Sequence, residues 1–283
     1  MLGDGLTVKR IVVTGANGFI GCRVVRQIRA AGHQAFAPGR EEWRLGAPLP
    51  PECDEADAII HLACAVLNAR DRRTAAAVDY DGAMILLQQN RKLQEGGRRR
   101  KFIFISSQSA RPDAGNDYGR SKWDIELLLD HGDEYIVRPG LVYDHDGSSV
   151  FGVFETLARL PVVPIPSRRA CIQPIDVEEL AKGLLRVIES EGAPRRLELG
   201  AVKPLTLAEM VSAVARRAGR RAPLGLPFPA MPLRLAAWLA DYGLSLSPPL
   251  LERIDGLLAL QPMNTAPSLA ALGLNLAPFD KAN

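Results

Sequence analysis

The stretch RIVVTGANGFIG, residues 10–21, decides the fold. Residues 11–13 form a β-branched apolar run, which is typical of a strand buried on both faces of a parallel sheet. Apolar residues then recur with helical spacing over 19–31. Three glycines separate strand from helix at three-residue intervals, namely Gly15, Gly18 and Gly21. This order predicts a pyrophosphate-binding turn, because glycines permit a tight turn, close approach to phosphate and close helix–strand packing, while the helix N-terminus offers free N–H groups.

Strands and helices continue to alternate after this turn. The predicted strands are 34–38, 57–63, 101–107, 134–138, 171–177 and 197–200, and the predicted helices are 71–95, one opening near 118, and 178–189. Residues 41–56 are rich in proline and acidic side chains and predict a loop. Regular alternation implies a Rossmann-type, doubly wound and mainly parallel sheet with helices on both faces.

The alternation is interrupted at residues 144–170 and stops at 201. The predicted helices of these segments are 150–160, 206–218, 233–244 and 249–260, and the predicted non-helical segments are the proline-spaced loop 161–170 and the breaker 227–232. Thr206 and Glu209 are spaced as a capping box. We therefore expect a dinucleotide-binding domain, residues 8–143 plus about 171–200, and a small, mostly helical C-terminal substrate-binding lobe, residues 144–170 plus 201–283.

Composition excludes several classes of function. The 283 residues are 47% hydrophobic and 24% charged, and the net charge of +3 is too small to indicate a nucleic-acid-binding protein. No apolar run reaches the length of a membrane span, about 18 residues, and the first ten residues lack the apolar core of a signal peptide. The four cysteines have no metal-ligand spacing and predict reduced thiols in a cytoplasmic protein.

Two histidines are predicted to be structural. His61 stands alone in an apolar run, which favours a core histidine over a catalytic one. The cluster Asp144-His145-Asp146-Gly147 favours a polar turn over a metal site. No metal is expected.

The end of the second predicted strand bears on the choice of cofactor. An acidic residue there commonly holds the ribose hydroxyls of NAD, whereas an arginine accommodates the 2′-phosphate of NADP. This chain has Gly39-Arg40 at that point and no acid before Glu41. Arg40 therefore favours NADP over NAD, with Arg23 as a second candidate for the phosphate. The alternative is that Arg40 is a solvated loop residue and Glu41 or Glu42 contacts the ribose.

A tyrosine and a lysine lie one helical turn apart in YGRSK, residues 118–122, after a predicted strand that ends in serines. Residues four apart share a helix face, and the Lys122 ammonium together with a cationic nicotinamide would lower the pKa of Tyr118. Tyr118 could then exchange a proton with a substrate alcohol or ketone while hydride moves to or from the nicotinamide. A serine at the strand end would orient the substrate oxygen.

The chain resembles the extended short-chain dehydrogenase/reductases of the NAD(P)-dependent epimerase/dehydratase family. The resemblance rests on TGANGFIG (14–21), IIHLA (59–63), FISSQS (104–109), YGRSK (118–122), RPGLVYD (138–144) and PIDVEELA (174–181). It implies that Tyr118 is the acid/base, Lys122 binds the ribose and Ser107 is the third catalytic residue. The cofactor-binding residues that it implies are Gly15, Asn17, Gly18, Phe19, Ile20, Gly21, Leu62, Ala63, Lys122 and Pro139, with Arg40 added from the argument above.

The sequence departs from the family pattern at several positions. An asparagine of the family is replaced by Asp79, and the acidic pair of its dehydratases by Gln108-Ser109, which disfavours a dehydratase because water loss needs an acid. Ser106 or Ser109 could take the role of Ser107. The substrate-binding candidates are Ser109, and Arg168 and Arg169 as diphosphate contacts, although these arginines could equally form a solvated turn.

Three hypotheses follow for the function. The first is an NADP-preferring oxidoreductase that transfers hydride to or from a keto or hydroxyl group, with a nucleotide sugar as the expected substrate. The second is an NAD-dependent epimerase of a UDP-hexose at C4, and the third is a non-catalytic dinucleotide-binding sensor or assembly protein. The resemblance also predicts a homodimer that pairs through two helices, one of them carrying Tyr118.

Overall fold

A computed structural model describes residues 7–66, 71–144, 151–166, 170–229 and 255–279 of the chain. Its centre is a six-stranded sheet in the order β2-β1-β3-β4-β5-β9, with every neighbouring pair parallel. The strands are β1 (Arg10–Thr14), β2 (Gln34–Phe36), β3 (Ala58–His61), β4 (Lys101–Ile105), β5 (Glu134–Pro139) and β9 (Arg196–Leu199). The predicted doubly wound α/β fold is confirmed.

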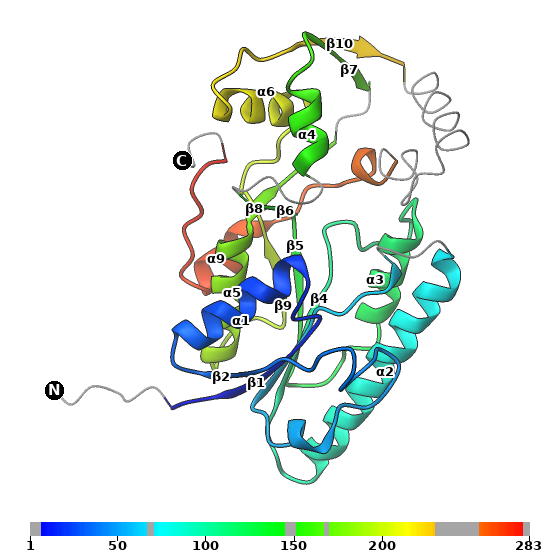
Figure 1. Cartoon of the computed structure of the whole chain (residues 1–283), viewed down its shortest axis with the longest axis vertical. Helices are drawn as coiled ribbons and strands as arrows, with labels where there is room; N and C mark the ends of the chain where they lie inside the picture. Colours follow the sequence, from blue (N-terminus) through cyan, green and yellow to red (C-terminus); the bar gives the residue numbers. More distant parts are fainter. Residues whose placement is uncertain (1–6, 67–70, 145–150, 167–169, 230–254, 280–283) are drawn as a thin grey trace, which may run out of the picture.

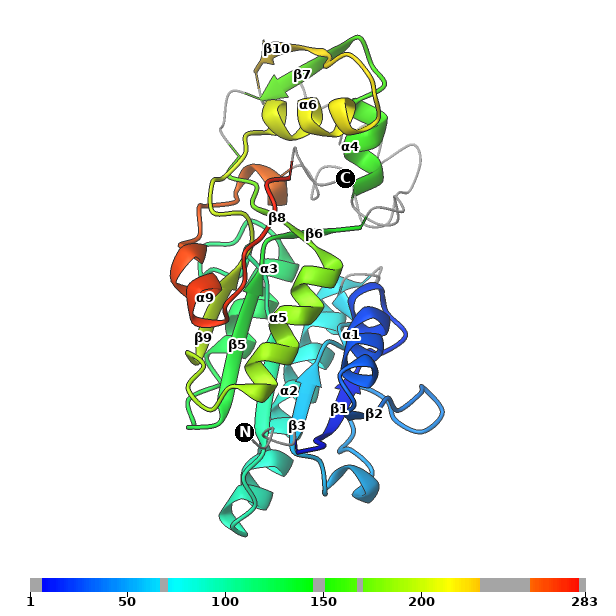
Figure 2. The same cartoon turned by 90° about the vertical axis from the view of Figure 1, so that its left-hand side faces the viewer.

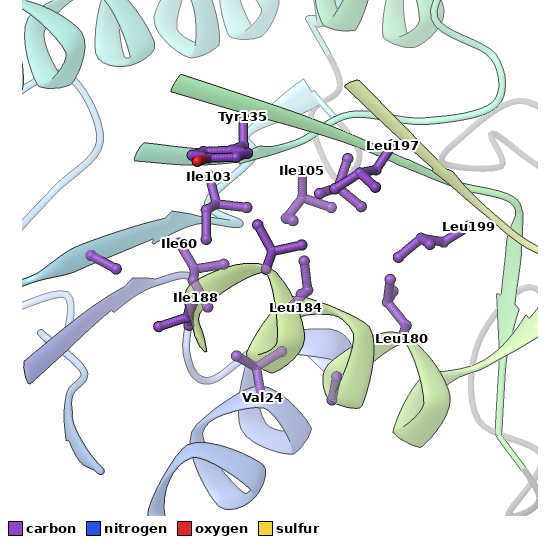
Figure 3. Close-up of a cluster of buried hydrophobic side chains, with 14 of the residues drawn as sticks. Val24, Ile60, Ile103, Ile105, Tyr135, Leu180, Leu184, Ile188, Leu197 and Leu199 are labelled. Carbon is purple, nitrogen blue, oxygen red and sulfur yellow. The ribbon is translucent and has the colours of Figure 1, made fainter. Parts of the chain in front are cut away.

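Helices cover both faces of the sheet (Figure 1). One face carries α1 (Phe19–Ala30) and α5 (Val177–Glu189), and the other carries α2 (Arg72–Glu95) and α3 (Asp117–Glu126). The first interface contains Val24 of α1, Leu184 of α5 and Ile103 of β4, all nearly inaccessible to solvent (Figure 3). These apolar runs are continuous because both faces of each central strand are buried. The alternating sequence pattern therefore predicted the layers correctly.

The predicted loop between β2 and β3 packs against the second face. Trp43, Leu49 and Cys53 are buried there with residues of α2 and α3, and a short 3₁₀ helix, η1 (Pro51–Cys53), interrupts the irregular chain. The Trp43 Nε1–H donates to the Ala47 carbonyl at 2.8 Å. β2 lies at one edge of the sheet, and this loop follows it.

A smaller lobe stands at one end of the sheet (Figure 2). The short parallel pair β6 (Leu141–Tyr143) and β8 (Pro174–Asp176) leads to it, and the lobe contains α4 (Phe151–Leu157) and α6 (Leu207–Arg217). The capping box predicted for α6 is confirmed, since Thr206 and Glu209 exchange side-chain and backbone hydrogen bonds. Of the two predicted apolar helices, 233–244 and the first half of 249–260 lie outside the described residues, while 255–258 are helical.

The prediction of loops at the prolines of this lobe was wrong. β7 (Val162–Pro166) and β10 (Leu224–Phe228) form a two-stranded parallel sheet. Proline lacks an N–H and suits only a strand edge. Pro164 and Pro166 alternate along β7, so the positions without an N–H lie on one side of the strand and leave the other side to hydrogen bond.

The last described helix, α9 (Thr265–Ala271), packs on the six-stranded sheet rather than on the lobe. Leu269 and Leu272 are buried with residues of α5 and β9, and the Ser268 hydroxyl accepts the Glu198 N–H at 2.9 Å. The division placed at residue 201 therefore assigned this segment to the wrong part of the structure. None of the described helices is both long and apolar enough to span a membrane.

Candidate functional site

The glycine turn after β1 is built from contacts with backbone atoms. Gly15 has φ +70°, which favours glycine, and a Cβ there would lie 2.8 Å from the Ala63 nitrogen. A Cβ on Gly21 would lie 2.2 Å from the Gly15 carbonyl oxygen. Gly18 is the N-cap of α1 without a side-chain hydrogen bond, and the first turn of the helix contains no acidic residue. The free N–H groups of this helix end therefore fit an anionic pyrophosphate.

The ends of β1 and β3 are joined through one buried hydroxyl. The Thr14 Oγ1 accepts the N–H groups of Leu62 at 3.2 Å and Ala63 at 3.3 Å, and lies 2.8 Å from the Nδ1 of His61. Since this oxygen already accepts two hydrogen bonds, its own proton goes to Nδ1 of a neutral imidazole. Burial and then the Lys122 charge lower the pKa of His61 to about 3. His61 is thus a core histidine that fixes the strand ends, as expected.

This neutral histidine should make the protein sensitive to acid. His61 stays unprotonated in the folded chain until about pH 3, whereas in the unfolded chain it binds a proton below about pH 6.5. The contribution of His61 to the free energy of unfolding is therefore fully present above about pH 6.5. It is lost as the pH falls below this value, by at most about 1.4 kcal/mol per pH unit. Urea unfolding from pH 7 to 4 should show a shallower decline for His61→Phe than for the native chain. The control is His131→Asn, at an exposed histidine, which should keep the native dependence of unfolding free energy on pH. Equal slopes for the native chain and both variants would contradict the assignment.

The start of α3 packs tightly against the loop that follows β4. The Asn116 side chain caps the helix, its Oδ1 accepting the Gly119 N–H at 2.7 Å. A Cβ on Gly119 would lie 2.5 Å from the Ser109 carbonyl oxygen and 2.8 Å from the Ala114 Cβ. The absence of a side chain at Gly119 thus lets the first turn of α3 approach the serines at the end of β4.

Ser107, Tyr118 and Lys122 come together at this point. The Ser107 side chain lies close enough to the Tyr118 hydroxyl to lower its pKa. The Ser107 and Ser109 Oγ atoms are 2.9 Å apart. The buried Lys122 ammonium donates to the Ile105 carbonyl at 2.9 Å and lies 5.9 Å from the Tyr118 ring centre. The predicted shared helix face is confirmed.

The pKa of Tyr118 is higher than expected from the sequence. Burial raises it most, the nearby Cys64 and Asp79 side chains raise it further, and the Ser107 hydroxyl lowers it. Lys122 is not among the causes, and its ammonium is bound to the carbonyl at the end of β4. Tyr118 in this structure is therefore a protonated phenol, which can donate a proton, rather than a phenolate prepared by Lys122.

Ser106 is committed to a buried ion pair that the sequence analysis missed. Its hydroxyl donates to Glu126 of α3, whose carboxylate also accepts from the Arg138 Nε at 2.7 Å and Nη2 at 2.5 Å. Glu126 is nearly inaccessible to solvent. The pair links the ends of β4 and β5 to the helix of Tyr118, so Ser106 serves packing while Ser107 reaches the phenol. The spacing of eight residues from Tyr118 to Glu126 was the available signal.

Two further buried side chains hold the loops of the site. The Asp79 carboxylate accepts the N–H groups of Ala65 at 2.5 Å and Val66 at 3.1 Å, and the Cys64 thiol at 3.2 Å. Gln108 donates to the Cys171 carbonyl at 2.7 Å and the Gln261 carbonyl at 2.8 Å. Asp79 therefore shapes the chain after β3, and Gln108 ties the serine loop to the lobe. Asp79 was recognised only as a departure from a family pattern.

The remaining predicted cofactor residues lie around the same end of the sheet, where its strands have their carboxyl ends. Asn17 is exposed beside the glycine turn, Phe19 and Ile20 are half-buried in the first turn of α1, and Pro139 ends β5 with its carbonyl accepting the Gln108 N–H at 2.9 Å. No further contact was expected of them. Their positions are compatible with a dinucleotide that crosses this end of the sheet.

The candidate phosphate-binding arginines differ in their surroundings. Arg40 is exposed just after β2, and no described residue pairs with its guanidinium. Glu42 accepts the Gly39 N–H at 2.8 Å and so belongs to the turn. Arg23 instead forms an ion pair with Asp144 at 2.9 Å. Arg168 and Arg169 lie outside the described residues, as do His145 and Asp146, and the described part contains no cluster of three or more metal-ligating side chains.

This fold defines an α/β protein of the Rossmann type. Residues 11–129, less than half of the chain, match the model of the NAD dependent epimerase/dehydratase family. A curated relative, the ceramide reductase of Caulobacter vibrioides, is 30% identical over 194 residues, which make up 62% of this chain. The alignment spans only 59% of that relative's length.

Solved structures share the fold at low sequence identity. A human epimerase family protein, solved with NADPH, has a TM-score of 0.69 and 20% identity over 94% of each chain. The dTDP-4-dehydrorhamnose reductase of Bacillus anthracis, solved with NADP, has a TM-score of 0.65 and 16% identity over 80% of this chain and 86% of its own. The UDP-glucose 4-epimerase of Thermus thermophilus, solved with NAD, has a TM-score of 0.56 and 22% identity over 78% and 86%.

Proposed function

We propose that the protein is an NADP-preferring reductase that converts a keto group into an alcohol, with Tyr118 as the proton donor. The observation that carries the proposal is the contact of Ser107 with Tyr118 beside the buried Lys122, beyond the turn of Gly15, Gly18 and Gly21. NAD(P)H, when bound, supplies the hydride. Ser107 holds the carbonyl oxygen of the substrate, Tyr118 gives that oxygen its proton, and Lys122 binds the nicotinamide ribose.

The protonation of Tyr118 supports the direction of reduction. Burial and nearby negative groups keep its phenol neutral, and a neutral phenol hydrogen-bonded at a carbonyl oxygen is placed to donate in the transition state. Asp79 contributes to this state, and an asparagine there would remove that charge. An epimerase must also withdraw a proton from an alcohol, and for that step the neutral phenol would first have to lose its own proton. Epimerisation of a UDP-hexose with tightly held NAD is therefore the second candidate.

Arg40 supports the preference for NADP. It is an exposed cation just after β2, and no described residue pairs with its guanidinium; in the same turn Glu42 bonds the Gly39 N–H, which leaves the exposed Glu41 as the acidic side chain open to a ribose. Arg40→Gln should weaken NADPH binding by about tenfold and leave NADH binding unchanged. The reason is that one charge-assisted contact contributes about 1.5–3 kcal/mol to binding, and solvent screening reduces this contribution at an exposed site. Calorimetric titration with each cofactor measures both. Arg44→Gln, an exposed neighbour, is the matched control, and an equal loss for both cofactors would contradict the role.

Two classes of substrate have support. A nucleotide sugar is the expectation from sequence, and two of the solved structures with this fold act on such sugars by name. The relative with 30% identity is named a ceramide reductase, which favours a keto group on a long-chain lipid. Either substrate suits the same three residues, because both present a ketone to the site.

The test follows NADPH oxidation by the purified protein with a dTDP-4-keto sugar and, separately, with a keto sphingolipid in detergent. Turnover of either substrate supports the reductase and identifies the class. NAD that remains bound through gel filtration, with interconversion of UDP-hexoses, would replace the proposal by the epimerase. The third hypothesis has a test in cells that lack the gene. If an inactive Tyr118 variant restored every phenotype that the deletion changes, the non-catalytic sensor would be favoured instead.

We also place the enzyme in the cytoplasm, because its four cysteines are all free thiols. The homodimer remains a prediction. The exposed Val78 of α2 and Leu127 at the end of α3 support pairing through these two helices.

A further inference from the structure

The small sheet of the lobe exposes an unusual group of apolar side chains. Five large hydrophobic side chains on or beside its two strands are between 39% and 61% exposed, namely Leu160, Val162, Leu224, Leu226 and Phe228. We call these five residues the β7–β10 face. Six further large hydrophobic residues with such exposure are spread over the rest of the described chain. Clustered exposed apolar side chains mark an interaction surface, whereas scattered ones do not.

Strand register explains why these side chains share one face. Val162 pairs with Leu224, and Pro164 pairs with Leu226. Side chains two apart on a strand point the same way, so the odd-numbered neighbours point to the opposite side. There Val163 is buried, and a Cβ on Gly225 would lie 3.9 Å from the Ala208 Cβ of α6. β7 thus covers the core of the lobe with its odd-numbered side, whereas β10 is exposed along its whole length, and the even-numbered side of both strands has no described partner.

Cations flank the β7–β10 face. The two strands are parallel and begin side by side, where the Leu224 N–H donates to the Pro161 carbonyl at 2.9 Å. Arg159 precedes one strand, and Arg220 and Arg221 precede the other; all three are exposed, and none pairs with a described residue. The segments 156–170 and 210–229 contain no acidic residue at all. The two strands and the segments that lead directly into them therefore carry basic but no acidic side chains.

The position of this surface leaves it accessible. β7 and β10 lie at the tip of the lobe in both views, and the nucleotide-binding sheet lies at the other end of the molecule (Figures 1 and 2). A flat partner could therefore contact the tip without covering the glycine turn or α3.

We propose that the β7–β10 face docks on the surface of an anionic lipid bilayer. Leu224, Leu226 and Phe228 enter the headgroup–acyl boundary, and Arg159, Arg220 and Arg221 contact the negative headgroups. Interfacial binding of this kind combines buried apolar area with electrostatic attraction, and the cytoplasmic leaflet is negatively charged. A second copy of the chain is a poorer partner, because pairing two such faces would bring their arginine borders together without any carboxylate.

The experiment is co-sedimentation of the full chain with vesicles of phosphatidylcholine, alone or with about one third phosphatidylglycerol. We expect binding to the anionic vesicles only, and its loss in ~0.5 M salt. Arg220→Gln with Arg221→Gln should weaken partitioning by about thirtyfold, since each cation near the surface contributes about 1 kcal/mol. Leu226→Ser with Phe228→Ser should weaken it further, and both side chains are exposed, so the fold should survive. Val8→Ser with Arg29→Gln, both exposed and distant, is the matched control.

Three results would overturn the proposal. The first is equal sedimentation with and without anionic vesicles. The second is binding that both variants of the β7–β10 face leave unchanged, which would place the contact elsewhere. The third is a native chain that does not bind vesicles, combined with a change in the Leu226→Ser/Phe228→Ser protein. A lower thermal midpoint of that variant would show that another part of this chain covers the face. A lower molecular mass of that variant would show that a second copy covers it. None of these readings depends on catalysis.

Discussion

Tyr118→Phe should lower kcat for reduction by about 10²- to 10⁴-fold, the usual contribution of a positioned general acid. Phenylalanine keeps the ring beside Lys122 and removes only the hydroxyl that contacts Ser107. NADPH affinity and the thermal midpoint should therefore change little. Stopped-flow or steady-state NADPH oxidation, with whichever ketone proves to be the substrate, measures the rate, and calorimetry measures the affinity.

Tyr135→Phe is the matched control for this change. Tyr135 is the second residue of β5, is buried, and has no described hydrogen bond at its hydroxyl. It lies at the opposite end of its strand from Pro139, so its variant should keep native kcat within about twofold, the effect expected of a change away from the reacting groups. A Tyr118→Phe enzyme with native kcat would exclude Tyr118 as the proton donor. A parallel loss of NADPH binding would show that the variant disturbs the cofactor site instead.

The sequence predicted those features whose residues are neighbours along the chain. The β1–glycine–α1 order, the four-residue spacing of Tyr118 and Lys122, and the Thr206–Glu209 capping box depend on local geometry alone, and all three are found in the structure. Local spacing fixes these contacts, because helical and extended backbones have definite periods.

Features that join distant segments were beyond the sequence. The pairing of β7 with β10 unites residues about 60 positions apart, and the prolines of both segments argued against strands. Arg23 pairs with Asp144, 121 positions away. Ser106 and Ser107 carry identical hydroxyls, and only the buried Glu126 behind β4 distinguishes the one that packs from the one that reaches Tyr118. Burial likewise decides the pKa of Tyr118, which local charge alone predicted to be lowered.

Gly21→Ala should strongly destabilise the contact between β1 and α1. Its Cβ would lie 2.2 Å from the Gly15 carbonyl oxygen and 2.7 Å from the Ala16 Cα, and both are backbone atoms that no rotamer change can move. Helix α1 must then shift away from β1, at a cost of about 1–3 kcal/mol or more in the free energy of unfolding. Because the helix N-terminus moves with it, we expect NADPH binding to fall by at least about tenfold.

Two other glycines serve as controls for this packing effect. One of them tests helix propensity alone, and the other tests access of the pyrophosphate to the turn. Gly152 lies in α4 with open space around its Cα, so Gly152→Ala should be neutral or stabilise the protein by up to about 1 kcal/mol. Gly18 has ordinary φ −78° and only one near contact, 3.1 Å to the Gly15 oxygen. Gly18→Ala should therefore leave urea stability nearly native while its methyl group obstructs the pyrophosphate and weakens NADPH binding. Native stability for Gly21→Ala would contradict the close packing, whereas native NADPH affinity for Gly18→Ala would contradict the binding of pyrophosphate at this turn, because packing and binding place separate demands on the three glycines.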